Sequence, residues 1–209
     1  VMTGVNPQGV QVVSFKKPSS EELDHDFLWR ISKALPARGQ IGIFNRSYYE
    51  ETLVVRVHPP ILAGQHLPQE LVTKSIWEER LEDIAAFERY FARQGYLILK
   101  YFLHVSKEEQ KARFLSRLDE PEKNWKFALG DVREREHWDE YQQAYEATIR
   151  ATAAPHAPWF VVPADHKWFT RLVVSQTLVA AIEGLDLAWP KPALAPADLA
   201  AARKALAKD

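Results

Sequence analysis

Residues 41–50 read Ile-Gly-Ile-Phe-Asn-Arg-Ser-Tyr-Tyr-Glu, a short apolar run that ends at a group of polar and charged side chains. Four apolar residues are too few for a stable helix and predict a strand buried on both faces, as in a parallel sheet. In open α/β sheets ligands bind beyond the carboxyl ends of the strands, so Asn45, Arg46 and Glu50 are candidate site residues. The alternative is that Asn45 or Ser47 only caps a following helix.

The composition is that of one globular domain, with 209 residues, 46% hydrophobic and 26% charged. The 27 Lys and Arg against 28 Asp and Glu leave a net charge of −1, which provides no overall field for nucleic acid or an anionic membrane. With no Cys, disulfides, thiolate metal sites and cysteine nucleophiles are excluded. No apolar stretch approaches the ~20 residues of a membrane span. We therefore expect a cytoplasmic protein without nucleic-acid or membrane partners.

Strands are predicted near residues 10–15, 96–105 and 159–163 in addition to residues 41–44. Helical periodicity predicts helices at 19–35, 47–57, 69–93, 106–117, 132–151 and 167–185, the first and fourth opened by capping boxes. Because each strand is joined to the next through at least one helix, the fold class is α/β. It is a three-layer parallel sheet with helices on both faces and the strand at 96–105 near its centre.

Cationic side chains follow the predicted strands and are expected to converge on one rim of the sheet. They are Lys16 and Lys17 after the first strand, Arg46 after the second, Lys107 and Arg113 after the third, and Lys167 after the fourth. Guanidinium groups bind phosphate oxygens in pairs, and lysines act as point charges. A nearly neutral chain with this rim predicts a polyanionic ligand.

Three features have simple structural interpretations. His104, inside a strand, is interpreted as a hydrogen-bonded core histidine because no second ligand lies at metal spacing. Asp26 and Arg30 are four residues apart and could form a surface ion pair on a helix. The seven Trp could fill the core or support an interface between subunits, and the core is the commoner location.

Several longer motifs resemble the family-2 polyphosphate kinases. They are Gly-Val-Asn-Pro-Gln-Gly (4–9), Phe-Lys-Lys-Pro-Ser (15–19), His-Asp-Phe-Leu-Trp-Arg (25–30), Gly-Ile-Phe-Asn-Arg-Ser-Tyr-Tyr-Glu-Glu (42–51) and Glu-Lys-Asn-Trp-Lys-Phe (122–127). Their order and spacing also match. The resemblance implies a P-loop kinase fold related to thymidylate kinases, and transfer of a phosphoryl group between inorganic polyphosphate and a nucleoside mono- or diphosphate with Mg²⁺.

The resemblance also implies roles for individual residues. Asn45-Arg46 falls on the Walker B segment, where many members have Asp-Arg. Asn45 stands where those members have Asp. This Asn, with Tyr-Tyr-Glu-Glu at 48–51, resembles the branch of the family that phosphorylates AMP as well as ADP. The nucleotide side would be lined by Gly4, Asn6, Lys16, Lys17, Asp26 and Arg30. A lid at about residues 106–136 would close over phosphates with Arg113, Arg117, Lys123, Lys126 and Arg133.

The resemblance further implies one phosphotransferase domain at residues 1–190, with a Pro/Ala-rich tail at 191–209, and assembly into homodimers or tetramers. Adenine nucleotides are the expected substrates, with guanine nucleotides as a second candidate. The residues that would bind Mg²⁺ are left open.

The chain departs from the family pattern because no G-x-x-x-x-G-K phosphate loop occurs in it. We therefore expect a fragment, or a chain without its upstream part, that lacks the first strand and the Walker A loop. Such a chain alone should be inactive, prone to associate, and bind polyphosphate weakly through Arg113, Arg117 and Lys126. The alternatives are a catalytically dead nucleotide- or polyphosphate-binding or assembly module, and an unrelated α/β protein with a basic rim.

Overall fold

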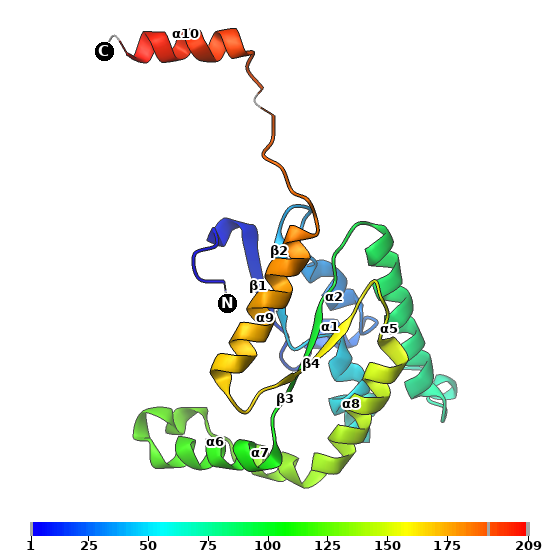
Figure 1. Cartoon of the computed structure of the whole chain (residues 1–209). Helices are drawn as coiled ribbons and strands as arrows, with labels where there is room; N and C mark the ends of the chain where they lie inside the picture. Colours follow the sequence, from blue (N-terminus) through cyan, green and yellow to red (C-terminus); the bar gives the residue numbers. More distant parts are fainter. Residues whose placement is uncertain (1, 192, 208–209) are drawn as a thin grey trace.

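The computed structural model describes residues 2–191 and 193–207. Val1, Pro192, Lys208 and Asp209, which belong to the predicted domain and tail, lie outside the described residues. The described strands form two parallel pairs (Figure 1). They are β1 (Val10–Ser14) paired with β2 (Ile41–Asn45), and β3 (Lys100–His104) paired with β4 (Trp159–Pro163).

The α/β class with parallel strands is confirmed, but the strands do not form one continuous sheet. In the described part of the chain β2 pairs with β1 alone and β3 with β4 alone, since no other described segment forms a strand between them. Ile41, Ile43 and Phe44 are accordingly half-buried, and the prediction of a strand buried on both faces was wrong. The predicted strand at 96–105 is shorter, and its predicted central position was wrong for the same reason.

Helices cover both faces of the β3–β4 pair. On one face, Lys100 pairs with Glu88 of α5 (Ile76–Arg93), and Phe102 stacks on Tyr145 of α8 (Trp138–Thr152) with ring centroids 4.2 Å apart. On the other face, the hydroxyl of Tyr101 lies 2.7 Å from that of Thr177 in α9 (Lys167–Glu183). Alternate residues of β3 therefore contact different helix layers, as the two-residue period of a strand requires.

The predicted helix at 19–35 is interrupted. Ser19 and Glu22 form the predicted capping box of α1 (Ser20–Leu23), and the chain turns before α2 (Trp29–Ala34). The turn is stabilised by the Asp26 carboxylate, which accepts the Leu28 amide at 2.9 Å and so competes with helical hydrogen bonds.

Other predicted helices are also divided into shorter elements. The prediction at 47–57 corresponds to the 3-10 helix η2 (Tyr48–Thr52) and α3 (Val54–Val57). The segment between the helices predicted at 47–57 and 69–93 contains α4 (Pro59–Ala63). The helix predicted from residue 69 is η3 (Gln69–Leu71) followed, after a gap, by α5. Gly95 follows α5 with φ +87°, a left-handed conformation that is common for Gly just after a helix.

The main core lies where η2, α5 and α8 meet. Tyr49, Leu53, Ile84 and Ala144 are buried there and pack against Trp159 of β4. The tryptophans as a group do not fill this core. Trp125, Trp168 and Trp189 are 78%, 67% and 96% exposed, so the preferred core interpretation was wrong for these three. His104 is exposed at the carboxyl end of β3, and its interpretation as a core residue was also wrong.

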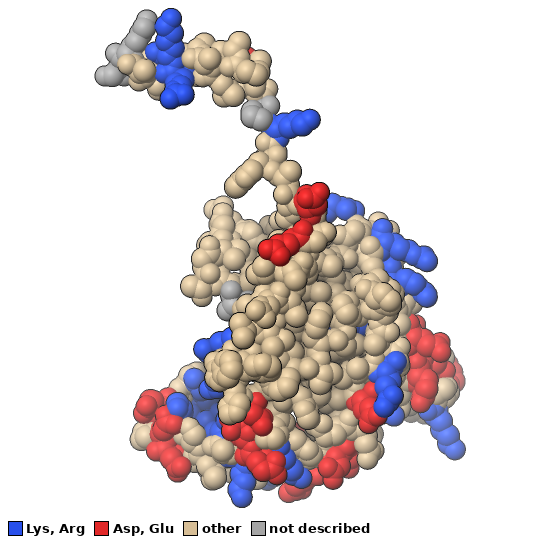
Figure 2. Space-filling view, in the orientation of Figure 1, with Lys and Arg blue, Asp and Glu red and all other residues tan. Residues whose placement is uncertain are grey.

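An arm projects from the body between β3 and α8 (Figure 1). It consists of α6 (Lys107–Asp119), η4 (Pro121–Lys126), α7 (Leu129–Glu134) and η5 (Arg135–His137), and we call it the lid. The helix predicted at 132–151 is thus divided between α7, η5 and α8. Positive and negative side chains are interspersed over the lid, whereas the middle of this face is uncharged (Figure 2).

The chain beyond α9 extends away from the body and carries α10 (Pro196–Leu206), whose residues are exposed (Figure 1). Among the described helices none is sufficiently long and apolar to cross a membrane.

Candidate active site

The turn after β2 presents Arg46 and Glu50 on the same side. Arg46 has φ +62°, which is unusual for a residue other than Gly, and its side chain is 61% exposed. The Ser47 hydroxyl then accepts the Tyr49 amide at 3.3 Å and begins η2. One turn later Glu50 Oε2 lies 3.8 Å from Arg46 Nη1. Ser47 therefore caps a helix, as the simpler interpretation required, while Arg46 remains available to a ligand.

Glu50 lies in a partly buried position among charged groups. Burial raises the pKa of its carboxyl above the ordinary value, and the positive charges of Arg46 and Arg30 partly offset this rise. Burial, followed by the charge of Glu50, also raises the pKa of Tyr145 in α8. The charge of Glu50 therefore interacts with groups in α2 and α8 as well as in its own turn, so Glu50 lies where several elements meet.

A cavity of about 210 Å³ separates the end of β2 from β3. It is lined by Arg46, Ser47, Tyr49, Glu50, Leu53, Tyr101, Phe102, Leu103, Tyr145 and Trp159. The cavity thus lies between the two strand pairs and opens beside the Arg46 turn.

A second, basic cavity of about 470 Å³ lies beside the end of β1. Its lining includes Lys16, Lys17, Arg30 and Lys33 together with the carboxylate of Glu22. Arg30 donates to the Lys16 carbonyl at 2.9 Å, so two of the residues predicted to line the nucleotide side are in direct contact. Lys33 was missed in the sequence, although its position one turn after Arg30 on α2 is a usable signal.

Asp26, Gly4 and Asn6 have local contacts and do not join these cations in the described structure. Arg30 pairs with Glu22, at 3.7 Å, rather than with Asp26 as the simple interpretation expected. Gly4 has φ +89°, and the Asn6 side chain accepts the Gln8 amide at 3.0 Å before β1 begins. Gly4 and Asn6 precede β1, whereas Lys16 and Lys17 follow its carboxyl end.

The base of the lid is attached to the end of β4. Arg113 donates from Nη2 to the carbonyls of Ala164 and Asp165, at 2.7 and 2.9 Å, and from Nε to Glu109 at 2.8 Å. Asp165 Oδ1 accepts the Ser106 amide at 2.7 Å, and this hydrogen bond lowers the pKa of the Asp165 carboxyl. Ser106 caps α6 through the Glu109 amide, but Asp165 takes the place expected for the Glu109 side chain.

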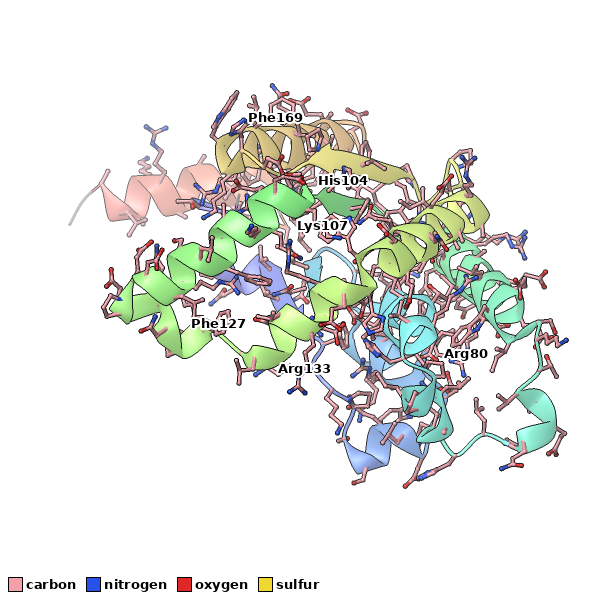
Figure 3. All side chains as sticks on the ribbon, turned by 90° about the horizontal axis from the view of Figure 1, so that it is seen from below. Arg80, His104, Lys107, Phe127, Arg133 and Phe169 are labelled. Atoms are coloured by element: carbon pink, nitrogen blue, oxygen red, sulfur yellow. The ribbon has the colours of Figure 1, made fainter. Side chains whose placement is uncertain are left out.

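The remaining lid cations lie further along the arm. Arg117 is 3.8 Å from Asp131, Lys123 pairs with Glu120, and the Lys126 ammonium lies 4.9 Å from the centre of the Trp125 ring. Arg133 is exposed on α7, away from His104 and Lys107 at the lid base (Figure 3).

Arg135 is a lid residue that no sequence motif indicated. Its Nη1 donates to the Lys107 carbonyl at 3.0 Å and to Gln110 Oε1 at 2.6 Å, which joins the two ends of the lid. No local sequence pattern distinguishes it from the other lid arginines.

In the described residues no group of three or more His, Asp or Glu could hold a metal ion. In the turn at the end of β2, Asn45 carries an amide oxygen and Glu50 a carboxylate. Mg²⁺ is usually bound by one or two carboxylates together with substrate phosphates, so this small donor set is compatible with a metal that binds together with a phosphorylated substrate.

Comparison with known protein families identifies the chain. The family model described as Polyphosphate kinase 2 (PPK2) matches residues 1–188. The chain belongs to the polyphosphate kinase 2 family. The resemblance stated from the motifs is therefore confirmed.

Individual relatives of this polyphosphate kinase 2 chain agree. An ADP-polyphosphate phosphotransferase of Rhodopseudomonas palustris is 52% identical over 192 residues, covering 91% of this chain and 66% of the relative. An AMP/ADP-polyphosphate phosphotransferase of Meiothermus ruber is 47% identical, covering 92% and 68%. The chain thus spans about two thirds of the length of these curated relatives.

The solved structures confirm the fold. The crystal structure of polyphosphate kinase 2 from Arthrobacter aurescens TC1 matches with a TM-score of 0.87 and 43% identity, over 98% of this chain and 67% of that chain. A putative polyphosphate kinase 2 from Pseudomonas aeruginosa matches with a TM-score of 0.77 and 31% identity, over 88% and 37%. The two strand pairs and the lid therefore belong to a polyphosphate kinase 2 fold.

Proposed function

We propose that the protein transfers a phosphoryl group between inorganic polyphosphate and a nucleoside mono- or diphosphate, converting AMP or ADP to ADP or ATP. The observation that carries this proposal is the family match over residues 1–188. The names of the relatives support it, since they are ADP- and AMP/ADP-polyphosphate phosphotransferases. The Asn45-Arg46 pair followed by Tyr-Tyr-Glu-Glu supports use of AMP as well as ADP.

Arg46 is proposed to neutralise the phosphate that is transferred. Its guanidinium is exposed, emerges at the carboxyl end of a parallel strand and borders the cavity between the strand pairs. Phosphoryl transfer requires little covalent chemistry from the protein, and most of the rate enhancement comes from positioning and from offsetting charge on the equatorial oxygens. Glu50 would hold Arg46 in place when no phosphate is bound.

The basic cavity beside β1 is proposed to bind the phosphates of the nucleotide. Lys16, Lys17 and Arg30 line it and are in the motifs that the family resemblance assigns to this side. Lys33 adds a fourth positive charge. Asp26, Gly4 and Asn6 stay predictions for nucleotide binding, because none of them is among the residues that line this cavity.

The lid is proposed to close over polyphosphate with its outer cations, Arg117, Lys123, Lys126 and Arg133. Arg113 has a different proposed role. Two of its donor nitrogens are occupied by the Ala164 and Asp165 carbonyls and by Glu109, so it holds the lid base to β4. A guanidinium bound in this way is a fixed pivot and is poorly placed to follow a moving lid.

Mg²⁺ is the proposed cofactor, with Asn45 and Glu50 as the side chains that would contribute oxygen ligands. When bound, it would supply positive charge that offsets the negative charge of the phosphates. A cytoplasmic location, a preference for adenine over guanine nucleotides and assembly into dimers or tetramers stay predictions. The exposed apolar residues Trp168, Leu172 and Val179 on α9 support association.

A catalytically dead binding module is the second candidate, favoured only by the absence of G-x-x-x-x-G-K from these 209 residues. The in-frame gene sequence upstream of Val1 distinguishes the two. The test of function is a luciferase-coupled assay of the full-length gene product with polyphosphate, Mg²⁺ and AMP or ADP. ATP formation supports the kinase, whereas transfer from a different phosphoryl donor alone would refute it.

A further inference from the structure

A buried ionic network lies directly beneath the Arg46 turn. Lys100 Nζ donates to Glu88 Oε2 at 2.6 Å, to the Tyr49 hydroxyl at 3.0 Å and to the Thr152 carbonyl at 2.8 Å. Glu88 Oε1 accepts the hydroxyls of Tyr48 and Tyr49, each at 2.7 Å. The side chains of Lys100 and Glu88 are only 6% and 1% exposed. The network therefore joins β3, α5, α8 and η2.

Stability alone does not account for this network. Replacing a buried ion pair with apolar side chains of similar size is often neutral or stabilising, because the charges must lose their hydration. The pair here is nevertheless fully hydrogen-bonded. Among the described residues, every buried side-chain nitrogen and oxygen has a hydrogen-bond partner. Burial and the charge of Glu88 raise the pKa of Tyr48, so its hydroxyl stays a donor. Such a network specifies one arrangement of the groups that it joins.

The rest of η2 is held in the same way. Glu51 pairs with Arg80 of α5 and accepts the Gln65 amide at 2.9 Å, and the Thr52 hydroxyl lies 3.1 Å from that of Thr148. Four of the five side chains of η2 are thus tied to neighbouring elements by polar contacts. The fifth is Glu50, which is directed to Arg46.

This arrangement also maintains the unusual backbone of Arg46. A non-Gly residue with positive φ is strained and persists only where the surrounding structure enforces it. Ser47 alone separates Arg46 from Tyr48, the first residue of the anchored helix. Movement of η2 would therefore move both the guanidinium of Arg46 and its carboxylate partner.

We propose that Lys100 and Glu88 are positioning residues that fix Arg46 and Glu50 for phosphoryl transfer by anchoring Tyr48 and Tyr49. This inference rests on the proposed function. Lys100 and Glu88 are buried and do not belong to the predicted rim of cations that follow the strands. A displacement of about 1 Å in a group that contacts the reacting atoms can cost ~10²-fold in rate, which is why a site of this kind needs a rigid support.

The test variant is Tyr49→Phe in the full-length protein, because the Tyr49 hydroxyl contacts both Glu88 and Lys100 while the ring can remain packed. We expect kcat to fall about tenfold and KM for ADP to change by less than about twofold, as for an interaction needed in the transition state. The matched control is Tyr96→Phe, which removes a 3.0 Å hydrogen bond to the Pro36 carbonyl and should leave kcat unchanged.

A double-mutant cycle separates positioning from general destabilisation. If Tyr49 acts through Arg46 and Glu50, then Tyr49→Phe should change the residual rate of a variant carrying both Arg46→Ala and Glu50→Gln by less than about twofold, because both groups that it positions are gone. An equal loss of rate in both backgrounds would overturn the proposal.

Amide hydrogen exchange of residues 47–52 tests the anchoring without an activity assay. Tyr49→Phe should accelerate exchange in this segment about tenfold, since local opening becomes easier, and Tyr96→Phe should not. Unchanged exchange would refute the anchoring even if the enzyme is active. If Tyr49→Phe accelerates exchange but the wild-type protein transfers no phosphate, the anchoring is supported and the proposed function is refuted.

Discussion

The buried pair between Glu51 and Arg80 permits a quantitative test of the packing. Their side chains are 8% and 7% exposed, and Arg80 also donates to Gln65 at 2.9 Å and lies 5.0 Å from the Phe27 ring. Burial lowers the pKa of Arg80 to about 10, so its guanidinium is still charged at pH 7. The variant Glu51→Gln would leave this charge without its counter-ion.

Removal of one partner of a buried ion pair typically costs about 3–5 kcal/mol. For a chain of this size each kcal/mol lowers Tm by about 2–4 °C, so Glu51→Gln should lower Tm by about 6–20 °C. Arg80→Met should be similarly destabilising, since it leaves the carboxylate with Gln65 alone. The double variant should recover most of the loss because neither charge remains.

The assay is urea unfolding at pH 7, followed by tryptophan fluorescence, for the wild type, both single variants and the double variant. Glu146→Gln provides the control, since its pair with Arg150 is well exposed and such pairs contribute little. Two outcomes would show that the pair is hydrated and would refute the reasoning. Each single variant could lower the free energy of unfolding by less than about 1 kcal/mol, or the two losses could simply add in the double variant.

Arg46→Ala in the full-length protein should lower turnover at least ~100-fold, as measured by ATP formation, and an unchanged rate would make Arg46 an ordinary surface residue. Burial raises the pKa of Glu50 above its ordinary 4.5, so the contribution of this carboxyl to stability is present at low pH and is lost as pH rises through the folded pKa. Glu50→Gln should therefore raise the urea midpoint at pH 7 and lose this advantage near pH 4; an advantage that grows on acidification would contradict the assignment. Gly95→Ala should cost about 1 kcal/mol because φ is +87°, whereas helical Gly130→Ala, with open space around it, should stabilise. Residues 1–209 alone should show no transfer and should associate in light scattering, because no second described strand pairs with β2 or with β3 and Leu103 is 49% exposed; a stable, active monomer would refute this.

The local features of the chain were predictable because they depend on neighbouring residues. The strand at residues 41–44 and the Ser19–Glu22 capping box follow from a hydrophobic run and from side-chain caps. Failures came where one local signal opposed another. The helix predicted at 19–35 is interrupted because the Asp26 side chain satisfies the Leu28 amide and allows the chain to turn.

The candidate site was predicted in part. Lys16, Lys17 and Arg30 do meet at the end of β1, where Arg30 of α2 donates to the Lys16 carbonyl. The contacts of Arg113 with the Ala164 and Asp165 carbonyls were not predictable, because they join groups more than 50 residues apart. Spacing along a helix shows that an arginine is present on the lid but not whether its nitrogens are already occupied.

The sequence by itself determined the parallel α/β class, the family and the exposed Arg46 at a strand end, because periodicity, motifs and caps are short-range properties. Only the tertiary structure decided which charges are buried. Lys100 and Glu88 appear in the sequence as an ordinary strand lysine and helix glutamate, 12 residues apart, and the loop between them leaves their distance undetermined. Packing of α5 against η2 and α8 encloses them with Tyr49, and the loss of water makes their contact a rigid support for the Arg46 turn.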